Sequence, residues 1–146
     1  MGRTAWMMIA TGLLLLALAS SAGAGLYSRS LTEERFSMSC TETERTPAYS
    51  QLSVTYGKGS SVGSSMFIVR CFYDIARERG SSYFFKAREW SETGGPWRYK
   101  VYFLNERTIP LRQLLGDDYS PEAQRLYDEL GYQSLQLFAP LFDAQR

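Results

Sequence analysis

The sequence predicts a small two-layer α+β domain that follows a cleavable signal peptide. Three observations lead to this fold class. A long apolar run lies near the N-terminus, several later segments alternate apolar and polar residues, and two segments with helical spacing each end at a glycine. We expect the element order β-β-α-β-β-α-β over a single domain at 35–146, with an antiparallel or mixed sheet and two helices on one face.

Residues 1–24 have the composition of a signal peptide. Arg3 is their only charged residue, and the apolar run at 5–19 is short for a membrane span. Ala22 and Ala24 supply the small side chains that signal peptidase requires. We therefore expect cleavage after Ala24 and export to the periplasm or the extracellular space. The alternative is an uncleaved N-terminal anchor, which would be the only part of the protein in contact with a membrane.

The first half of the domain is expected to begin with two strands. A polar segment at 25–34 is interpreted as a flexible lead-in. Apolar and polar residues then alternate over 35–41 and again over 52–56, which is the pattern of half-buried strands. This alternation places Cys40 on the side of its strand that faces the core.

A Gly/Ser loop at 57–65 leads from the second strand into a predicted helix over 66–79. Gly80 follows the last helical residue, where a left-handed backbone conformation is needed. The spacing puts Cys71 on the apolar stripe of this helix and Arg70 on the polar side. Cys71 should therefore face the same core as the first strand.

The second half of the domain is expected to contain a hairpin, a helix and a closing strand. Aromatic-rich segments at 83–90 and 97–104 are strand-like and are joined by a longer loop. A short apolar turn at 110–115 precedes a second helix over 121–130, with a Ser-Pro start and a Gly stop. The final strand is predicted at 132–138.

The charge balance argues against nucleic acid as a partner. Removal of residues 1–24 takes away Arg3, so that 16 basic and 15 acidic residues become 15 of each. Binding to DNA or RNA draws its affinity from an excess of Lys and Arg that neutralises phosphates. A formally neutral chain lacks that excess, and we expect a protein or an envelope component as the partner instead.

Cys40 and Cys71 are the only two cysteines in the chain. In an oxidising compartment an even number of cysteines favours a disulfide, and both are expected to face the core. The bond would close a loop of about thirty residues and stabilise the fold by ~3 to 4 kcal/mol on the chain-entropy model. The alternative is two buried thiols that pack as small apolar side chains.

The sequence offers little support for catalysis. Histidine is absent, which removes the commonest general base and the commonest metal ligand. We assign no catalytic residue, no metal ligand and no cofactor. The adjacent Asp117 and Asp118 are the candidates for an alternative function, a carboxylate-dependent hydrolase acting on envelope polysaccharide. Acidic residues just before a helix are also explained by the positive end of that helix.

The Gly/Ser loop is a weak candidate for anion binding. It runs into a helix N-terminus, where backbone N–H groups can hold a phosphate or a carboxylate. Its glycine spacing fits neither common nucleotide-binding pattern, and a plain connector is the simpler interpretation. The residues of this hypothesis are Lys58, Gly59, Ser64 and Ser65, and either serine is a candidate N-cap.

The predicted hairpin combines aromatic and basic side chains. Trp, Tyr and Arg dominate binding hot spots, so this combination suits a glycan, an anionic envelope component or a partner protein. The alternatives are an ordinary amphipathic hairpin and a purely structural accessory subunit. We expect a non-enzymatic binding domain of the periplasm or the extracellular space. The candidate ligand-binding residues are Lys86, Arg88, Trp90, Trp97, Arg98, Tyr99 and Lys100.

Overall fold

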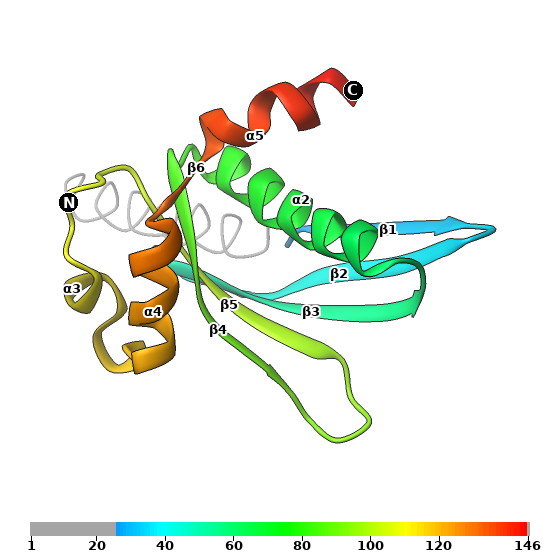
Figure 1. The fold of residues 1–146 in the computed structure, drawn as a ribbon, viewed down its shortest axis with the longest axis horizontal. Coiled ribbons are helices and arrows are strands. Elements are labelled where there is room, and N and C mark those ends of the chain that lie inside the picture. Colours follow the sequence, from blue (N-terminus) through cyan, green and yellow to red (C-terminus); the bar gives the residue numbers. More distant parts are fainter. Residues whose placement is uncertain (1–25, 146) are drawn as a thin grey trace, which may run out of the picture.

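The computed structural model describes residues 26–145, and the predicted signal segment lies outside this range. The fold is mixed α+β, with a curled antiparallel sheet in the order β1-β2-β3-β5-β4-β6 (Figure 1). The strands are β1 (Ser28–Glu33), β2 (Phe36–Arg45), β3 (Tyr49–Lys58), β4 (Tyr83–Ser91), β5 (Trp97–Leu104) and β6 (Gln133–Ser134). The helices are α2 (Ser61–Arg79), α3 (Leu111–Leu115), α4 (Pro121–Leu130) and α5 (Leu135–Phe142), with short 3₁₀ turns η1 (Gly116–Asp118) and η2 (Asp143–Gln145).

Helices cover both faces of the sheet, so the prediction of two helices on one face is wrong. β4 shows the physical reason, because its neighbouring aromatic residues are both buried and point to opposite faces. Phe84 packs beneath α2, with ring centroids 6.0 Å from Phe72. Phe85 packs on the other face, beside Tyr127 of α4. We call these two sides the α2 face and the α4 face.

α2 has the apolar stripe that the sequence predicts, but it begins five residues earlier. Cys71 and Ile75 are fully buried against the sheet, and Gly80 ends the helix with a φ of 71°. The N-cap is Ser60, whose hydroxyl accepts the N–H of Gly63, and the prediction of Ser64 or Ser65 is wrong. Most of the predicted loop at 57–65 is therefore helical, because Ser60 caps α2 earlier in the chain than expected.

The predicted lead-in at 25–34 contains strand β1. Leu31 lies opposite Met38 of β2 and packs against the core of the α2 face. Tyr27, just before the strand, donates its hydroxyl to Asp74 of α2 at 2.7 Å. The segment looks polar in sequence because β1 is an edge strand whose other face is open to solvent.

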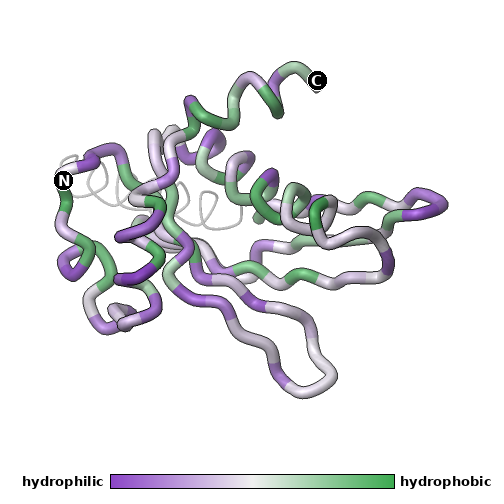
Figure 2. The backbone as a smooth tube through the Cα atoms, in the orientation of Figure 1, coloured by the Kyte–Doolittle hydropathy of each residue, from purple (hydrophilic) through white to green (hydrophobic). Residues whose placement is uncertain are grey.

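The predicted closing strand at 132–138 is instead two residues of β6 followed by helix α5. Ser134 caps this helix by accepting the N–H of Gln136. Figure 2 shows hydrophobic stretches along both α2 and α5, and the two helices pack together through Tyr73 and Phe142, whose ring centroids are 5.2 Å apart. Arg70 is consequently buried below Phe142, although the helical spacing assigns it to the polar side.

We predict that Phe142→Ala destabilises the fold by about 3 to 5 kcal/mol, because it removes a buried aromatic ring from the α2–α5 contact. Leu137→Ala is the matched control on the same helix, since Leu137 is 72% exposed. Denaturant unfolding of the two variants measures the difference. Equal effects of the two substitutions would contradict the packing of α5 on α2.

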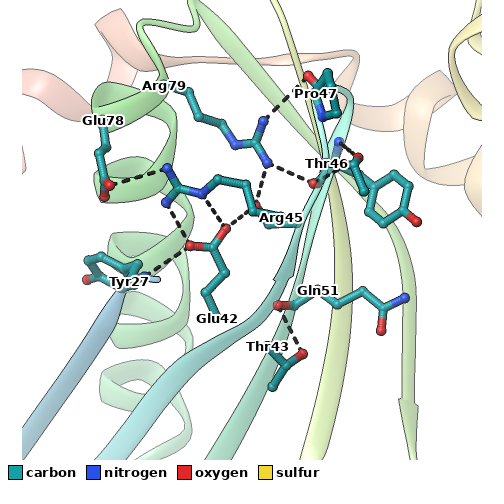
Figure 3. Close-up of polar contacts among 11 residues, drawn as sticks. Tyr27, Glu42, Thr43, Arg45, Thr46, Pro47, Gln51, Glu78 and Arg79 are labelled. Atoms are coloured by element: carbon teal, nitrogen blue, oxygen red, sulfur yellow. Dashed lines mark hydrogen bonds and ion pairs between the residues drawn. The ribbon is translucent and has the colours of Figure 1, made fainter. Parts of the chain in front are cut away.

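A buried carboxylate joins the first three strands at the C-terminal end of α2 (Figure 3). Glu42 has no exposed side-chain surface and accepts two hydrogen bonds from Arg45, at 2.7 and 2.9 Å. The hydroxyl of Ser50 and the backbone N–H of Tyr27 also donate to it. Burial by itself raises the pKa of Glu42, but these hydrogen bonds outweigh it and hold the pKa below the ordinary value.

The lowered pKa of Glu42 gives the stability of the fold a defined pH dependence. Because the folded state favours the ionised carboxylate, its contribution is complete above the unfolded-state value of 4.5 and is lost as the pH falls through the lower folded-state pKa. Glu42→Ala should cost about 3 to 5 kcal/mol at neutral pH, since Arg45 then lacks its buried partner. It should also flatten the acid limb of a stability-against-pH curve. Glu44→Ala, an exposed neighbour on β2, should leave both measurements nearly unchanged.

Candidate functional site

The aromatic-basic hairpin forms as predicted, from β4 and β5. Its two strands pair in regular register except for a bulge between Lys86 and Arg88. The extra residue reverses which face the following side chains occupy. Arg88 and Trp90 therefore join the α4 face, opposite Lys100 and Arg98 of β5. A continuous alternation would have placed them on the α2 face.

A cavity of about 890 Å³ lies between the hairpin, η1 and α4, and we call it the hairpin cavity. Its lining includes side chains from both groups that the sequence analysis singled out, the hairpin residues and the aspartate pair. α4 adds charged residues that the sequence analysis did not select. The residues that matter for the argument are Arg88, Trp90, Trp97, Asp117, Arg125 and Glu129.

Arg88 and Trp90 form one unit in the wall of the hairpin cavity. The guanidinium carbon of Arg88 lies 4.5 Å from the centroid of the Trp90 ring, which is a close cation–π contact. Trp97, on the first residue of β5, is 47% exposed and also lines the cavity. The wall thus presents two indole side chains and a guanidinium to whatever enters.

Lys100 and Asp118 form an ion pair that closes the base of this region. The ammonium of Lys100 lies 2.6 Å from the carboxylate and 4.0 Å from the centroid of the Tyr49 ring. Tyr102 donates its hydroxyl to the same carboxylate. Burial tends to raise the pKa of Asp118, but the hydrogen bonds from Lys100 and Tyr102 lower it overall. Asp118 is therefore held ionised, and the ammonium of Lys100 is paired with this carboxylate.

The other predicted hairpin residues have different surroundings. Tyr99 is a core residue of the α2 face, packed edge-on against Phe72 at 5.6 Å, and burial raises its pKa to about 12. Lys86 makes an ion pair with Glu89 at 2.7 Å. Arg98 is partly buried and lies opposite Trp90 in the ladder, outside the lining of the hairpin cavity.

A second cavity, of about 400 Å³, lies on the other side of β4, and we call it the α2 cavity. It is largely apolar, with walls from α2, β4, α4 and α5, and it includes Phe72, Leu130 and Phe138. Lys86, Glu89 and Leu126 line both cavities. The sequence analysis missed this cavity because α5 was expected to be a strand.

The residues of the anion-binding hypothesis do not converge on one point. Ser64 and Ser65 lie inside α2, where their hydroxyls donate to the carbonyls of Ser60 and Ser61 at 2.8 and 2.9 Å. A side chain at Gly59 would collide with the Phe36 ring, which explains the glycine by close packing. Lys58 is exposed at the end of β3. This geometry does not support an anion site.

Cys40 and Cys71 are both fully buried and in contact, as their expected positions on β2 and α2 imply. They are free thiols in this structure. The hydrogen bond with Cys71 and then burial raise the pKa of the Cys40 thiol above its ordinary value. Both thiols are shielded from solvent, and a bond between them would join the sheet to α2.

Neither the remaining side chains nor known proteins point to a particular chemistry. Across residues 26–145 no group of three or more His, Cys, Asp or Glu side chains is arranged to hold a metal ion. In the same range no helix is long and apolar enough to cross a membrane. Comparison with family models, curated proteins and solved structures finds no match to this chain.

Proposed function

We propose that the protein is an exported, non-enzymatic binding domain that holds an envelope component or a partner protein in the hairpin cavity. One observation carries the proposal, the gathering of Arg88, Trp90 and Trp97 in the wall of a single cavity. Its volume of about 890 Å³ falls in the range of ligand sites in proteins. Indole and guanidinium groups are the side chains most enriched at binding hot spots.

The interactions around the cavity favour binding over hydrolysis. A glycoside hydrolase needs one carboxylic acid that keeps its proton near neutral pH, and this requires a raised pKa. The pKa of Asp118 is lowered instead, and its carboxylate is engaged by Lys100 and Tyr102. Asp117 is exposed in the middle of η1. A fixed ion pair of this kind is suited to holding η1 against the hairpin.

Preorganisation of the cavity supports the same function. The Lys100–Asp118 pair joins β5 to the turn before α4, and Ser120 caps α4 by accepting the N–H of Ala123. Ala123 is itself buried against the sheet. Both walls are therefore fixed before a ligand arrives, which lowers the entropy cost of binding.

We predict that the double variant Arg88→Ala/Trp90→Ala loses binding by roughly tenfold or more, because it removes the cation–π unit from the cavity wall. The immobilised mature chain is incubated with extract of its own cell envelope, and the retained material is quantified. Arg35→Ala is the control, since it removes an exposed cation on the β1–β2 turn. Retention by the double variant equal to that of the control would overturn the proposal.

Export remains part of the proposal. Cleavage after Ala24 leaves every described element intact, because β1 begins at Ser28. We expect the two buried thiols, which share one core cluster, to form a disulfide in an oxidising compartment, which would stabilise the fold by ~3 to 4 kcal/mol. The bond would link the centre of β2 to the middle of α2, beneath the buried side of the helix.

We predict that the mature protein, isolated from the exported fraction and denatured without reductant, reacts with no thiol reagent. After reduction the same sample should show two thiols, Cys40 and Cys71. Its intact mass should match a chain that begins at Gly25. Two reactive thiols before reduction would contradict the disulfide, and a mass that retains residues 1–24 would contradict cleavage.

A further inference from the structure

β4 has a free edge along most of its length. Within the described part of the chain, β6 pairs with β4 only at Tyr83 and Phe84, between the end of α4 and the start of α5. The rest of β4 continues to Ser91 with β5 on one side and no strand on the other. An open strand edge of this kind presents backbone donors and acceptors to a partner.

The ladder shows which backbone groups point outward from this edge. The N–H of Phe103 in β5 donates to Ala48, on the side of β3. Tyr99 lies four residues before Phe103 on the same strand, and the direction of the backbone N–H and C=O repeats every second residue. The N–H and C=O of Tyr99 therefore also point to β3 and away from β4. Glu89 lies opposite Tyr99, and its own N–H and C=O therefore point away from β5, toward the free edge.

The two cavities lie on opposite sides of this edge. The α2 cavity is apolar and the hairpin cavity is charged, and Glu89 lines both of them. In an added strand, successive side chains would point alternately to the two sides. A strand paired with β4 would therefore place every second side chain in the apolar cavity and the others in the charged one.

We infer that the ligand of the hairpin cavity is an extended peptide segment of a partner protein, which pairs with the β4 edge as an additional strand. This inference rests on the proposed function and names its partner. The segment alternates apolar and basic residues. Apolar side chains fit the α2 cavity, and basic ones fit the hairpin cavity, whose lining holds the five acidic residues Glu89, Asp117, Asp118, Glu122 and Glu129 against the three basic residues Lys86, Arg88 and Arg125.

The bulge and the charged side chains of β4 would limit which chain segments can pair with its edge. Proteins use bulges and charged side chains to keep exposed edges from pairing indiscriminately. Here Lys86, Arg88 and Glu89 also line the cavities, so they restrict pairing to a segment whose side chains complement them. A glycan lacks the regular backbone that could use the outward groups of Glu89.

Selection from a random-sequence peptide library on the immobilised mature chain tests the inference. Enriched peptides should alternate apolar and basic residues. Glu89→Pro should weaken the selected peptide by roughly tenfold, because proline removes the outward N–H while a strand edge tolerates its backbone. Glu89→Ala is the matched control: it loses the same side chain and keeps the N–H, so the roughly tenfold loss is measured as the difference between Glu89→Pro and Glu89→Ala.

Hydrogen exchange supplies a second measurement that needs no variant. On addition of the selected peptide, the Glu89 amide should become protected, whereas the Trp90 amide, which faces β5, should already be protected in the free protein. Thermal melting of each variant confirms its fold, and if Glu89→Pro fails to fold, the exchange result decides. No change in Glu89 exchange on addition of peptide, or a library that yields no binder, overturns the inference.

The outcomes separate this inference from the proposed function. If Glu89→Pro retains envelope material while Arg88→Ala/Trp90→Ala does not, the hairpin cavity binds something other than a strand, and only the peptide inference fails. If neither variant changes retention, both fail. A wild-type chain that dimerises without added peptide, and becomes monomeric on Glu89→Pro, would assign the edge to a second copy and overturn the partner peptide.

Discussion

The buried carboxylate of Glu42 is the interaction on which the first half of the fold depends. It receives donors from the segment before β1, from β2 and from β3, so one side chain fixes the relative positions of three strands. α2 joins the same network through Arg79, which donates to Ser50 at 2.7 Å, and through the Glu78–Arg45 ion pair. A buried charge is costly unless its hydrogen bonds are complete, and here they come from three neighbouring segments.

This network explains why α2 lies where it does. The helix crosses the sheet with its C-terminal end held by Arg79, whose guanidinium also packs on the ring of Phe103 at 4.5 Å. With that end fixed, the opposite surface of α2 is available to α5, and the Tyr73–Phe142 contact fills it. The α2 cavity is the space left between α2, α4 and α5 above the open part of β4. The binding geometry thus follows from the position of one helix.

The sequence predicts the elements that carry their own local signals. α2, α4 and the hairpin have a capping glycine, a Ser-Pro start or clear alternation, and all three form. β1 and α5 were missed because tertiary contacts decide them. β1 is polar in composition and is held by pairing with β2, and α5 is an apolar segment that can form either a strand or a helix. The bulge at Lys86 has no glycine or proline to mark it, so the face of Arg88 and Trp90 could not be read from spacing.

The antiparallel pairing of β6 with β4 decides which part of the β4 edge stays open. Ser134 lies opposite Tyr83 and Gln133 opposite Phe84, so a strand that continued to residue 138 would run past Tyr83, away from Glu89. Ser134 instead caps a helix after two residues of pairing, and the chain turns onto α2. The residues that would continue the pairing toward Glu89 are those before Tyr132, and there the chain forms Gly131 and the last turn of α4. The β4 edge near Glu89 is therefore open because the chain forms α4 before β6, whereas the burial of Phe142 decides the course of α5.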